Sequence, residues 1–231
     1  MELSLFMKIA ILADIHGNLV AFRAVLEAAR KRNPSRFIVA GDIVGYGPRP
    51  NEVIELVYEI GALAIRGNHD QAIINCDYSY MNPYAAEAAK WTAGVLSAKN
   101  LNRLRSMKRT EVLEVEKRRI GVYHGSPEHP DEYVLDEHRA EQLLDWSDRD
   151  IVICGHTHIP LKVSLNDKIF LNPGSVGQPR DGNPFASFME LDLGSMRATL
   201  HRVEYSIEIT QEEMALHGLP KLLIDRLSNG Q

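Results

Sequence analysis

The chain has 231 residues, of which 45% are hydrophobic and 25% are charged, and its formal net charge at pH 7 is -5. This length and composition suit one globular domain, and we expect a single domain over residues 1–231. The negative charge and the lack of a Lys or Arg run exclude an evident nucleic-acid platform. No stretch approaches the roughly 20 apolar residues that cross a bilayer.

Two features of the sequence indicate a reducing, cytoplasmic setting. Cys76 and Cys154 cannot form a disulfide framework, and neither belongs to a CxxC pair. The apolar start, residues 3–13, lacks a basic leader and a small-residue cleavage site. We therefore interpret it as a buried first strand, and we expect a soluble cytoplasmic protein.

Apolar runs alternate with helical periodicity in the first third of the chain. The runs at 8–13, 36–40 and 62–65 have the length of buried strands. The segments between them, 18–31 and 51–60, carry apolar residues at helical spacing. This βαβαβ pattern predicts a mainly parallel sheet.

Two further helices are expected between residues 82 and 107, within an insertion of about 71–108 that we interpret as a small cap. Later apolar runs have strand length and, after Gly155, are separated by turns, which predicts an antiparallel second half. The later strands are expected at 120–123, 151–154, 161–165, 168–171, 186–193 and 197–203. A last helix, 210–217, is expected to begin with a capping box at Thr210.

Polar residues follow five of the expected strands, at the point where each strand ends. The carboxyl ends of parallel strands meet in one crevice, where function collects in open α/β sheets. The residues at these ends are Asp14, Asp42, Asn68, His124 and His156.

These residue types suit metal binding. Asp14 and His16 lie two residues apart and can hold one cation where the strand gives way to a loop. Asp42 can bridge two ions through its two oxygens, and Gly41 before it lets the backbone approach closely.

Two further motifs supply imidazoles. Gly67-Asn68-His69-Asp70 offers an amide oxygen, a free imidazole and a carboxylate that can orient that imidazole. In Gly155-His156-Thr157-His158, two imidazoles are spaced to face neighbouring ions.

Each motif alone has another interpretation. Asp14 or Asp42 could cap a helix, and a single histidine could be a satisfied core residue. The joint pattern argues for metal, because three carboxylates and five histidines buried around one crevice without a cation would be costly to desolvate.

The order Asp-x-His, Gly-Asp, Gly-Asn-His-Asp, His, Gly-His-x-His resembles the calcineurin-like metallophosphoesterases, in their bacterial and archaeal phosphodiesterase-like branch. The resemblance covers about residues 8–203. It implies an α/β fold, namely a four-layer αββα sandwich with a mixed sheet core and a small helical cap. It also implies two metal sites, the first held by Asp14, His16 and His158, the second by Asn68, His124 and His156, with Asp42 as the bridge.

The family's histidine that is not a ligand matches His69. The resemblance implies that His69 stabilises the phosphoryl transition state and protonates the leaving oxygen, with Asp70 as its orienting partner. A hydroxide bridging the two ions would attack the phosphorus, so no serine or cysteine nucleophile is needed. The mixed oxygen and nitrogen ligands suit manganese, iron, zinc or nickel better than calcium, and the resemblance favours manganese.

Residues 172–182 form a glycine- and proline-rich loop that resembles a loop of the same phosphodiesterase branch. Arg180 in this loop is the best candidate for a substrate contact, although pairing with Asp181 or Glu190 is equally expected. Tyr46 could lie beside a nucleobase. The aromatic residues of the cap could stack in the same way or simply pack, and they are Tyr78, Tyr80, Tyr84 and Trp91.

The expected activity is hydrolysis of small, nucleotide-like phosphodiesters or phosphomonoesters. A dinucleoside polyphosphate hydrolase and a protein phosphatase share the motif order, and a noncatalytic scaffold of similar fold is a further alternative. Retention of His69 with every ligand position argues against the scaffold. Oligomeric state and natural substrate stay open.

Overall fold

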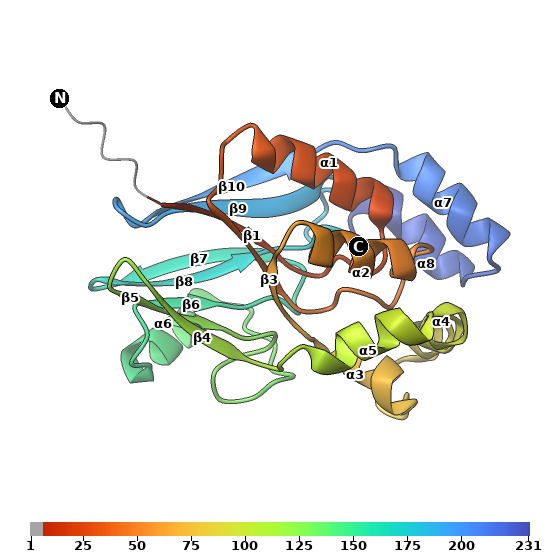
Figure 1. Cartoon of the computed structure of the whole chain (residues 1–231), viewed down its shortest axis with the longest axis horizontal. Coiled ribbons are helices and arrows are strands. Elements are labelled where there is room, and N and C mark those ends of the chain that lie inside the picture. Colours follow the sequence, from red (N-terminus) through yellow and green to blue (C-terminus); the bar gives the residue numbers. More distant parts are fainter. Residues whose placement is uncertain (1–6) are drawn as a thin grey trace.

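The computed structural model describes residues 7–231 and contains two five-stranded sheets packed face to face (Figure 1). The first sheet consists, in spatial order, of β10 (Arg197–Val203), β9 (Ala186–Asp192), β1 (Lys8–Leu12), β2 (Arg36–Ala40) and β3 (Leu63–Ile65). The second consists of β4 (Glu111–Val115), β5 (Arg118–Val122), β6 (Ile151–Ile153), β8 (Lys168–Pro173) and β7 (Pro160–Leu165). Residues 3–6 of the expected first apolar run lie outside the described residues.

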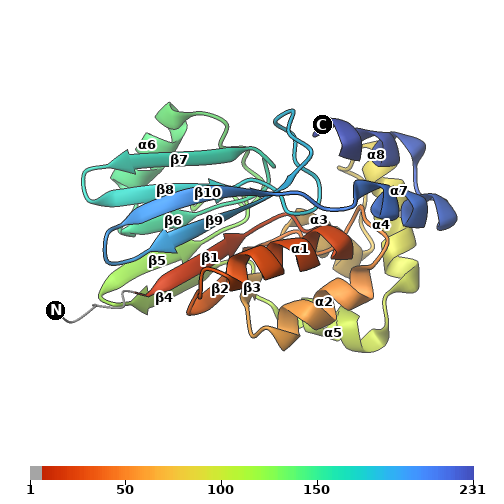
Figure 2. The same ribbon diagram turned by 90° about the horizontal axis from the view of Figure 1, so that it is seen from above.

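Helices cover the outer faces of both sheets and one end of the molecule (Figure 2). The helices are α1 (Leu19–Arg30), α2 (Pro50–Glu59), α3 (Asn68–Asn75), α4 (Pro83–Val95), α5 (Ala98–Ser106), α6 (Glu137–Trp146), α7 (Ile207–Leu216), α8 (Lys221–Asp225) and the 3-10 helix η1 (Arg226–Asn229). Helices α1 and α2 lie over the first sheet, and α6 lies over the second (Figure 1). No helix among residues 7–231 combines the length and the apolar character of a membrane span.

The side chains of β1 show why its sequence is almost continuously apolar. Ile9 and Ile11 point into the core between the two sheets. Ala10 and Leu12 point the other way, into the core under α1 and α2. A strand buried on both faces carries apolar residues at every position, because successive side chains alternate between the faces. The four-layer α/β fold with mixed sheets is confirmed.

The sequence pattern was right about the strand directions of the first sheet and wrong in one place in the second. β1, β2 and β3 are parallel, as the βαβαβ pattern predicts, and β9 runs antiparallel to both β1 and β10, which makes the first sheet mixed. The second half of the chain is not wholly antiparallel, because β8 pairs parallel with β6. Hairpin turns predict the β7–β8 and β9–β10 pairs, but pairing with distant strands follows from burial that no local pattern records.

Other elements were missed or misplaced. Strand β4 and helices α3, α6 and α8 were not expected. Helix α7 begins at Ile207, so Thr210 lies inside it and is not its capping residue. The Thr210 hydroxyl instead donates a hydrogen bond to Asn18 Oδ1 at 3.1 Å, far away in the sequence. This buried hydrogen bond explains why a threonine stands at position 210, where its sequence context resembled a helix cap.

Asn18 joins three parts of the fold. Its Oδ1 caps α1 by accepting from the backbone N–H of Ala21 and also accepts from Thr210. Its amide nitrogen donates to the carbonyl of Gly177 and to the Tyr205 hydroxyl. All these groups lie in the interior, so each would be costly to leave unpaired.

We therefore expect Asn18→Ala to lower the free energy of unfolding by about 2 kcal/mol or more, since a helix cap and several buried partners are lost together. Ser97→Ala is the matched control, because Ser97 caps α5 at an exposed position and its hydroxyl accepts only from the N–H of Asn100 among the described residues. Ser97→Ala should lower the free energy of unfolding by about 1 kcal/mol or less. Urea denaturation measures the free energy of unfolding of both variants. Equal losses would show that the buried hydrogen bonds of Asn18 add nothing to its role as a helix cap.

Candidate metal centre

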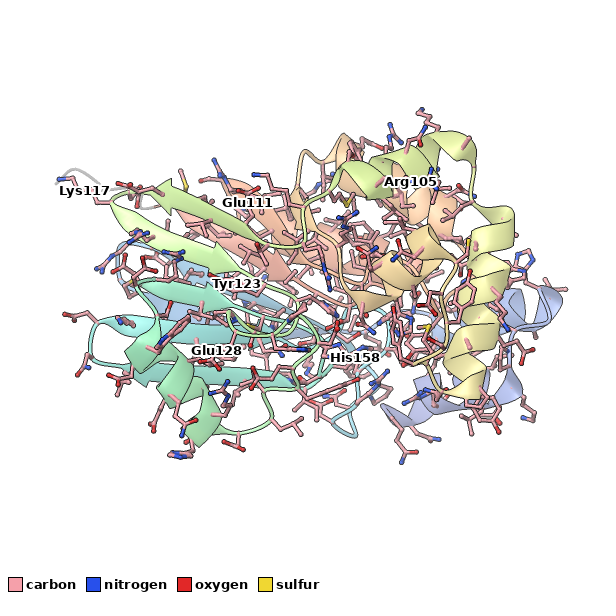
Figure 3. All side chains as sticks on the ribbon, turned by 90° about the horizontal axis from the view of Figure 1, so that it is seen from below. Arg105, Glu111, Lys117, Tyr123, Glu128 and His158 are labelled. Atoms are coloured by element: carbon pink, nitrogen blue, oxygen red, sulfur yellow. The ribbon has the colours of Figure 1, made fainter. Side chains whose placement is uncertain are left out.

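The polar residues at the strand ends meet on one side of the two sheets. Asp14 and Asp42 follow β1 and β2, and Asn68 opens α3 directly after β3. His124 follows β5, and His156 and His158 follow β6. In Figure 3, His158 lies where the strands meet the helical end of the molecule. The fold thus brings together residues that are up to 144 positions apart in the chain.

Two ligand clusters form there, and Asp42 belongs to both. Asp14, His16, Asp42 and His158 offer atoms within 4.8 Å of one another, as do Asp42, His124 and His156. Asp42 Oδ2 lies 3.5 Å from His16 Nε2 and 3.3 Å from His124 Nε2. Such a shared carboxylate is suited to bridge two neighbouring cations.

Asn68 completes the second cluster with an amide oxygen. Its Oδ1 lies 3.0 Å from His124 Nε2. The structure therefore brings together all seven residues that the sequence suggested as ligands. Their assignment to individual ions stays a prediction.

Five of these seven residues have a left-handed backbone conformation. Asp14, His16, Asp42, His156 and His158 have φ between 49° and 70°. Residues with a β-carbon adopt this conformation at a cost of roughly 1–3 kcal/mol each, and they persist where the surrounding structure imposes it. Clustering of such residues is typical of functional sites.

Glycines make room for the ligands. A Cβ on Gly67 would lie 2.2 Å from Asp42 Oδ1, and a Cβ on Gly41 would lie 2.5 Å from His124 Nδ1. Gly41 also has a φ of 91°, which favours glycine. The glycines in the Gly-Asp and Gly-Asn-His-Asp motifs are therefore needed for space around the ligands.

Asp70 does not make the contact that we expected with His69. Its carboxylate accepts hydrogen bonds from the backbone N–H groups of Ile43, Val44 and Gly67 at 3.0 to 3.2 Å. Within residues 7–231, Nδ1 of His69 has no hydrogen-bond partner. Asp70 thus fixes the loop after Asp42 to the start of α3, because buried N–H groups need acceptors.

Backbone carbonyls orient two of the imidazoles. His124 Nδ1 donates to the carbonyl of Ala40 at 2.9 Å, and His158 Nδ1 donates to the carbonyl of Gln178. With the proton on Nδ1, the lone pair of Nε2 faces the centre, as metal-binding histidines require. Across the described residues, His16 Nδ1 and His156 Nε2 are buried without a partner. The donor set therefore fits divalent ions.

Burial keeps three of the imidazoles neutral, which is the form that binds metal. It lowers the pKa of His156 to about 3 and holds the pKa values of His16 and His158 well below their ordinary value. Burial also opposes ionisation of Asp42, but attraction to the protonated His124 and the hydrogen bond with it outweigh burial and keep the pKa of Asp42 well below the usual range. A charged bridging carboxylate and neutral imidazoles are thus present together.

A cleft of about 190 Å³ opens beside the ligand clusters. His69 and Asn68 line it at the metal side, and Arg180 and Tyr46 line it beside them. The expected cap contributes another wall, formed by Tyr80, Met81, Asn82 and Ala85. A substrate in this cleft would therefore contact both the ligand clusters and the helical insertion.

Arg180 is not paired with Asp181 or Glu190. Its Nη2 donates to the Tyr46 hydroxyl at 3.2 Å and to Gln178 Oε1 at 3.1 Å, while Asp181 pairs with Arg202. The Tyr46 ring packs against the rings of both His16 and His69, with centroids 4.4 and 4.5 Å away. It lines the cleft together with Arg180.

Two residues of the cleft were missed in the sequence. Tyr133 lies 3.9 Å, between ring centroids, from His156, and Arg226 enters from the C-terminal 3-10 helix. A half-exposed tyrosine shortly after His124 was a weak signal for the first. Nothing local marks Arg226, because it lies about 70 residues from the last ligand in the chain.

The loop 172–182 supports the ligands from behind. Ser175 Oγ and the backbone N–H of Gly177 donate to the carbonyl of Asp14 at 2.8 and 2.9 Å. Asn172 donates to the carbonyl of Gly155 and to Thr157 Oγ1. Such supporting contacts hold ligands in position.

Comparison with known proteins agrees with this geometry. The family model of the calcineurin-like phosphoesterase superfamily domain matches residues 7–196. The chain belongs to this family. It is 34% identical to the uncharacterized protein MJ0912 of Methanocaldococcus jannaschii, over 96% of this chain and 98% of the relative. It is 29% identical to the phosphodiesterase YfcE of Escherichia coli K12, over 80% and 88% of the two chains.

A solved structure shows the same architecture over the whole chain. The metallophosphoesterase from Sphaerobacter thermophilus superposes with a TM-score of 0.86 at 37% identity, covering 98% of this chain and 100% of the other. This calcineurin-like phosphoesterase is thus a metal-dependent phosphoric ester hydrolase, and the buried clusters that share Asp42 offer ligand atoms suited to divalent metal.

We expect Gly67→Ala to displace the Asp42 carboxylate and to weaken metal binding by about 10- to 100-fold. The matched control is Gly94→Ala, because a Cβ on Gly94 meets no atom within 4 Å. Elemental analysis after dialysis against limiting manganese measures the bound metal. Full occupancy in the Gly67 variant would show that the close approach to Asp42 is not needed.

We also expect the manganese affinity of the metal-free phosphoesterase to rise between pH 6 and pH 8. Burial raises the pKa of Asp14 to about 8, and His124 has a pKa of about 10 because its negative neighbours outweigh burial. Both groups are protonated at pH 6 and must release protons to bind a cation, so each released proton raises the affinity about tenfold per pH unit. Calorimetry in buffers of different ionisation enthalpy counts these protons, and a flat affinity without proton release would contradict this.

Proposed function

We propose that this phosphoesterase hydrolyses small, nucleotide-like phosphodiesters or phosphomonoesters with two divalent ions, manganese being the favoured metal. The observation that carries the proposal is the Asp42 carboxylate, which is shared by two ligand clusters beside a cleft lined by His69. The relative YfcE is named as a phosphodiesterase, which supports diesters as substrates. The oxygen and nitrogen ligands support manganese, iron, zinc or nickel over calcium.

Two bound ions would supply Lewis-acid stabilisation of the phosphate oxygens and an activated water. The chain's own residues do the rest. Seven side chains hold the ions, and Arg180 presents guanidinium donors to the substrate within the cleft. The small volume of the cleft, about 190 Å³, with tyrosines on several walls, favours a small ester over the surface of a phosphoprotein.

His69 is the proposed general acid. Its ring is held by edge contact with His16, at 4.8 Å between centroids, and by packing on Tyr46. Burial lowers its pKa to about 4, so the free site holds it neutral. A bound phosphate anion would favour its protonated form and so prepare it to donate a proton to the leaving oxygen. Asp70 supports it indirectly, through the loop and helix that it joins.

A single domain with residues 71–108 as its cap is part of this proposal, supported by the cleft wall that Tyr80 and Met81 form. A cytoplasmic location is proposed as well, supported by the two unpaired cysteines.

We expect His69→Ala to keep its metal and to lose about 100- to 10,000-fold in turnover of an ester with a poor leaving group. The loss should be smaller for bis(p-nitrophenyl) phosphate, because a good leaving group needs less protonation. His138→Ala, at an exposed position of α6, is the control. Equal turnover of His69→Ala and the parent on the poor leaving group would remove the acid role.

Asp42→Asn should lose both bound metal and turnover, because its shared negative charge is removed. Elemental analysis with a manganese-dependent diesterase assay tests this together with the function itself. An Asp42→Asn protein that keeps two ions and full activity would overturn the bridging role.

A further inference from the structure

Two arginines that make no ion pair with an acidic side chain of residues 7–231 line the cleft. Arg180 comes from the loop after β8, and Arg226 opens η1, and both line the cleft with His69 and Asn68. Neither guanidinium lies within ion-pair distance of a carboxylate side chain in the part of the chain that the structure describes. Arg226 Nε donates to the main-chain oxygen of Gln231, the last residue given, and this contact leaves the two terminal nitrogens of the guanidinium available.

The two positive charges disfavour one another. Partial burial, together with the positive charge of Arg180, lowers the pKa of Arg226 below its ordinary value. Arg180 Nε is buried without a hydrogen-bond partner among residues 7–231. Like charges held together with unused donors are stabilised by a bound anion. The pair therefore has the character of an anion site.

The fold holds both arginines in place through a backbone junction. The N–H of Gly182 donates to the carbonyl of Gly230 at 2.9 Å, which joins the Arg180 loop to the residues after η1. Gly230 has a φ of 63°, and a Cβ on it would lie 2.6 Å from the backbone nitrogen of Asn183. The close approach of the two segments thus depends on a glycine.

The C-terminal helices are also anchored in an apolar cluster. Leu223 and Leu227, on either side of Arg226, pack with Ala85 and Ala88 of α4 and with Tyr46. Arg226 is therefore fixed between two core residues and is not a freely moving surface side chain. Figure 2 shows α8 beside α4 at the helical end of the molecule.

Arg226 lies outside the shared region, by which we mean the residues that the family model matches. The family match ends at residue 196, and all seven metal ligands and His69 lie before that residue. A residue that reaches the cleft from beyond the shared region is placed to select the substrate, since the shared residues already supply the metal site and the proposed acid.

We propose that Arg180 and Arg226 together bind a second phosphate group of the substrate, next to the phosphate at the metal centre. This rests on the proposed function and narrows it to nucleotide-like esters that carry at least two phosphates. The planar guanidinium groups can each give paired hydrogen bonds to phosphate oxygens. The second phosphate also neutralises two positive charges that line the same cleft.

Competition against bis(p-nitrophenyl) phosphate tests this at a fixed excess of manganese. The inhibition constants of AMP, with one phosphate, and of diadenosine tetraphosphate, with four, are measured for each variant, whether or not the competitor is cleaved. For Arg226→Gln we expect the constant of the tetraphosphate to rise by about tenfold or more, because a charged hydrogen-bonded contact is lost. The inhibition constant of AMP should rise by less than about threefold, because Arg226 would act on AMP only as a distant surface charge.

Two variants separate phosphate binding from a structural role. Arg226→Lys keeps the charge without the planar fork and should give a smaller rise for the tetraphosphate. Arg30→Gln, at an exposed position of α1, should change neither constant. The melting temperature and the turnover of the diester report whether the metal centre and the fold are intact.

Equal rises for AMP and the tetraphosphate would place Arg226 at the first phosphate or in a structural role and overturn the proposal, as would no rise for either. If the parent protein with manganese does not hydrolyse the diester, the proposed function fails instead. Calorimetric titration then measures the affinity of the same two nucleotides for the parent and for Arg226→Gln. A loss of affinity confined to the tetraphosphate supports the second phosphate site without any assay of hydrolysis.

Discussion

Burial of negative charge beside a group of imidazoles is the constraint on which this structure depends. Asp14 and Asp42 are 0% and 1% exposed, and His16, His124 and His158 lie against them at 3% exposure or less. Charges that leave water in this way are destabilising unless a partner compensates them. Divalent cations compensate several such groups at once, so the arrangement is stable as a metal site and costly without metal.

Several residues in and around the ligand clusters adopt backbone conformations that cost free energy, and these conformations hold the ligand side chains in place. Five ligands have positive φ, and glycines at 41 and 67 make space that no other residue would leave. Carbonyls of Ala40 and Gln178 fix two imidazoles, and Asp70 fixes the loop that carries Asp42. The two sheets pack on a shared apolar core, and the free energy of this packing offsets the backbone strain at the ligands.

The ligand clusters and most of the cleft walls come from different parts of the chain. The metal ligands and His69 sit on strand ends and on the first turn of α3, which are anchored in the sheets. The walls of the cleft come from the insertion after α3, from Tyr133 and from the C-terminal helices. Peripheral segments of this kind can change without disturbing the metal site, which is how one fold acts on different phosphate esters.

Local sequence patterning was enough to predict the residues of the two ligand clusters and most of the strands around them. Each ligand motif follows an apolar run, so local patterning places Asp14, Asp42, His124 and His156 at strand ends, and the sheet brings those ends together. Strand direction was only partly predictable, because β9 joins β1 and β8 joins β6 through contacts between distant segments. The tertiary structure alone decided the role of Asp70, the packing of Tyr46 and the place of Arg226 in the cleft. Those depend on which surfaces meet after the layers pack, and neither residue spacing nor local propensity records that.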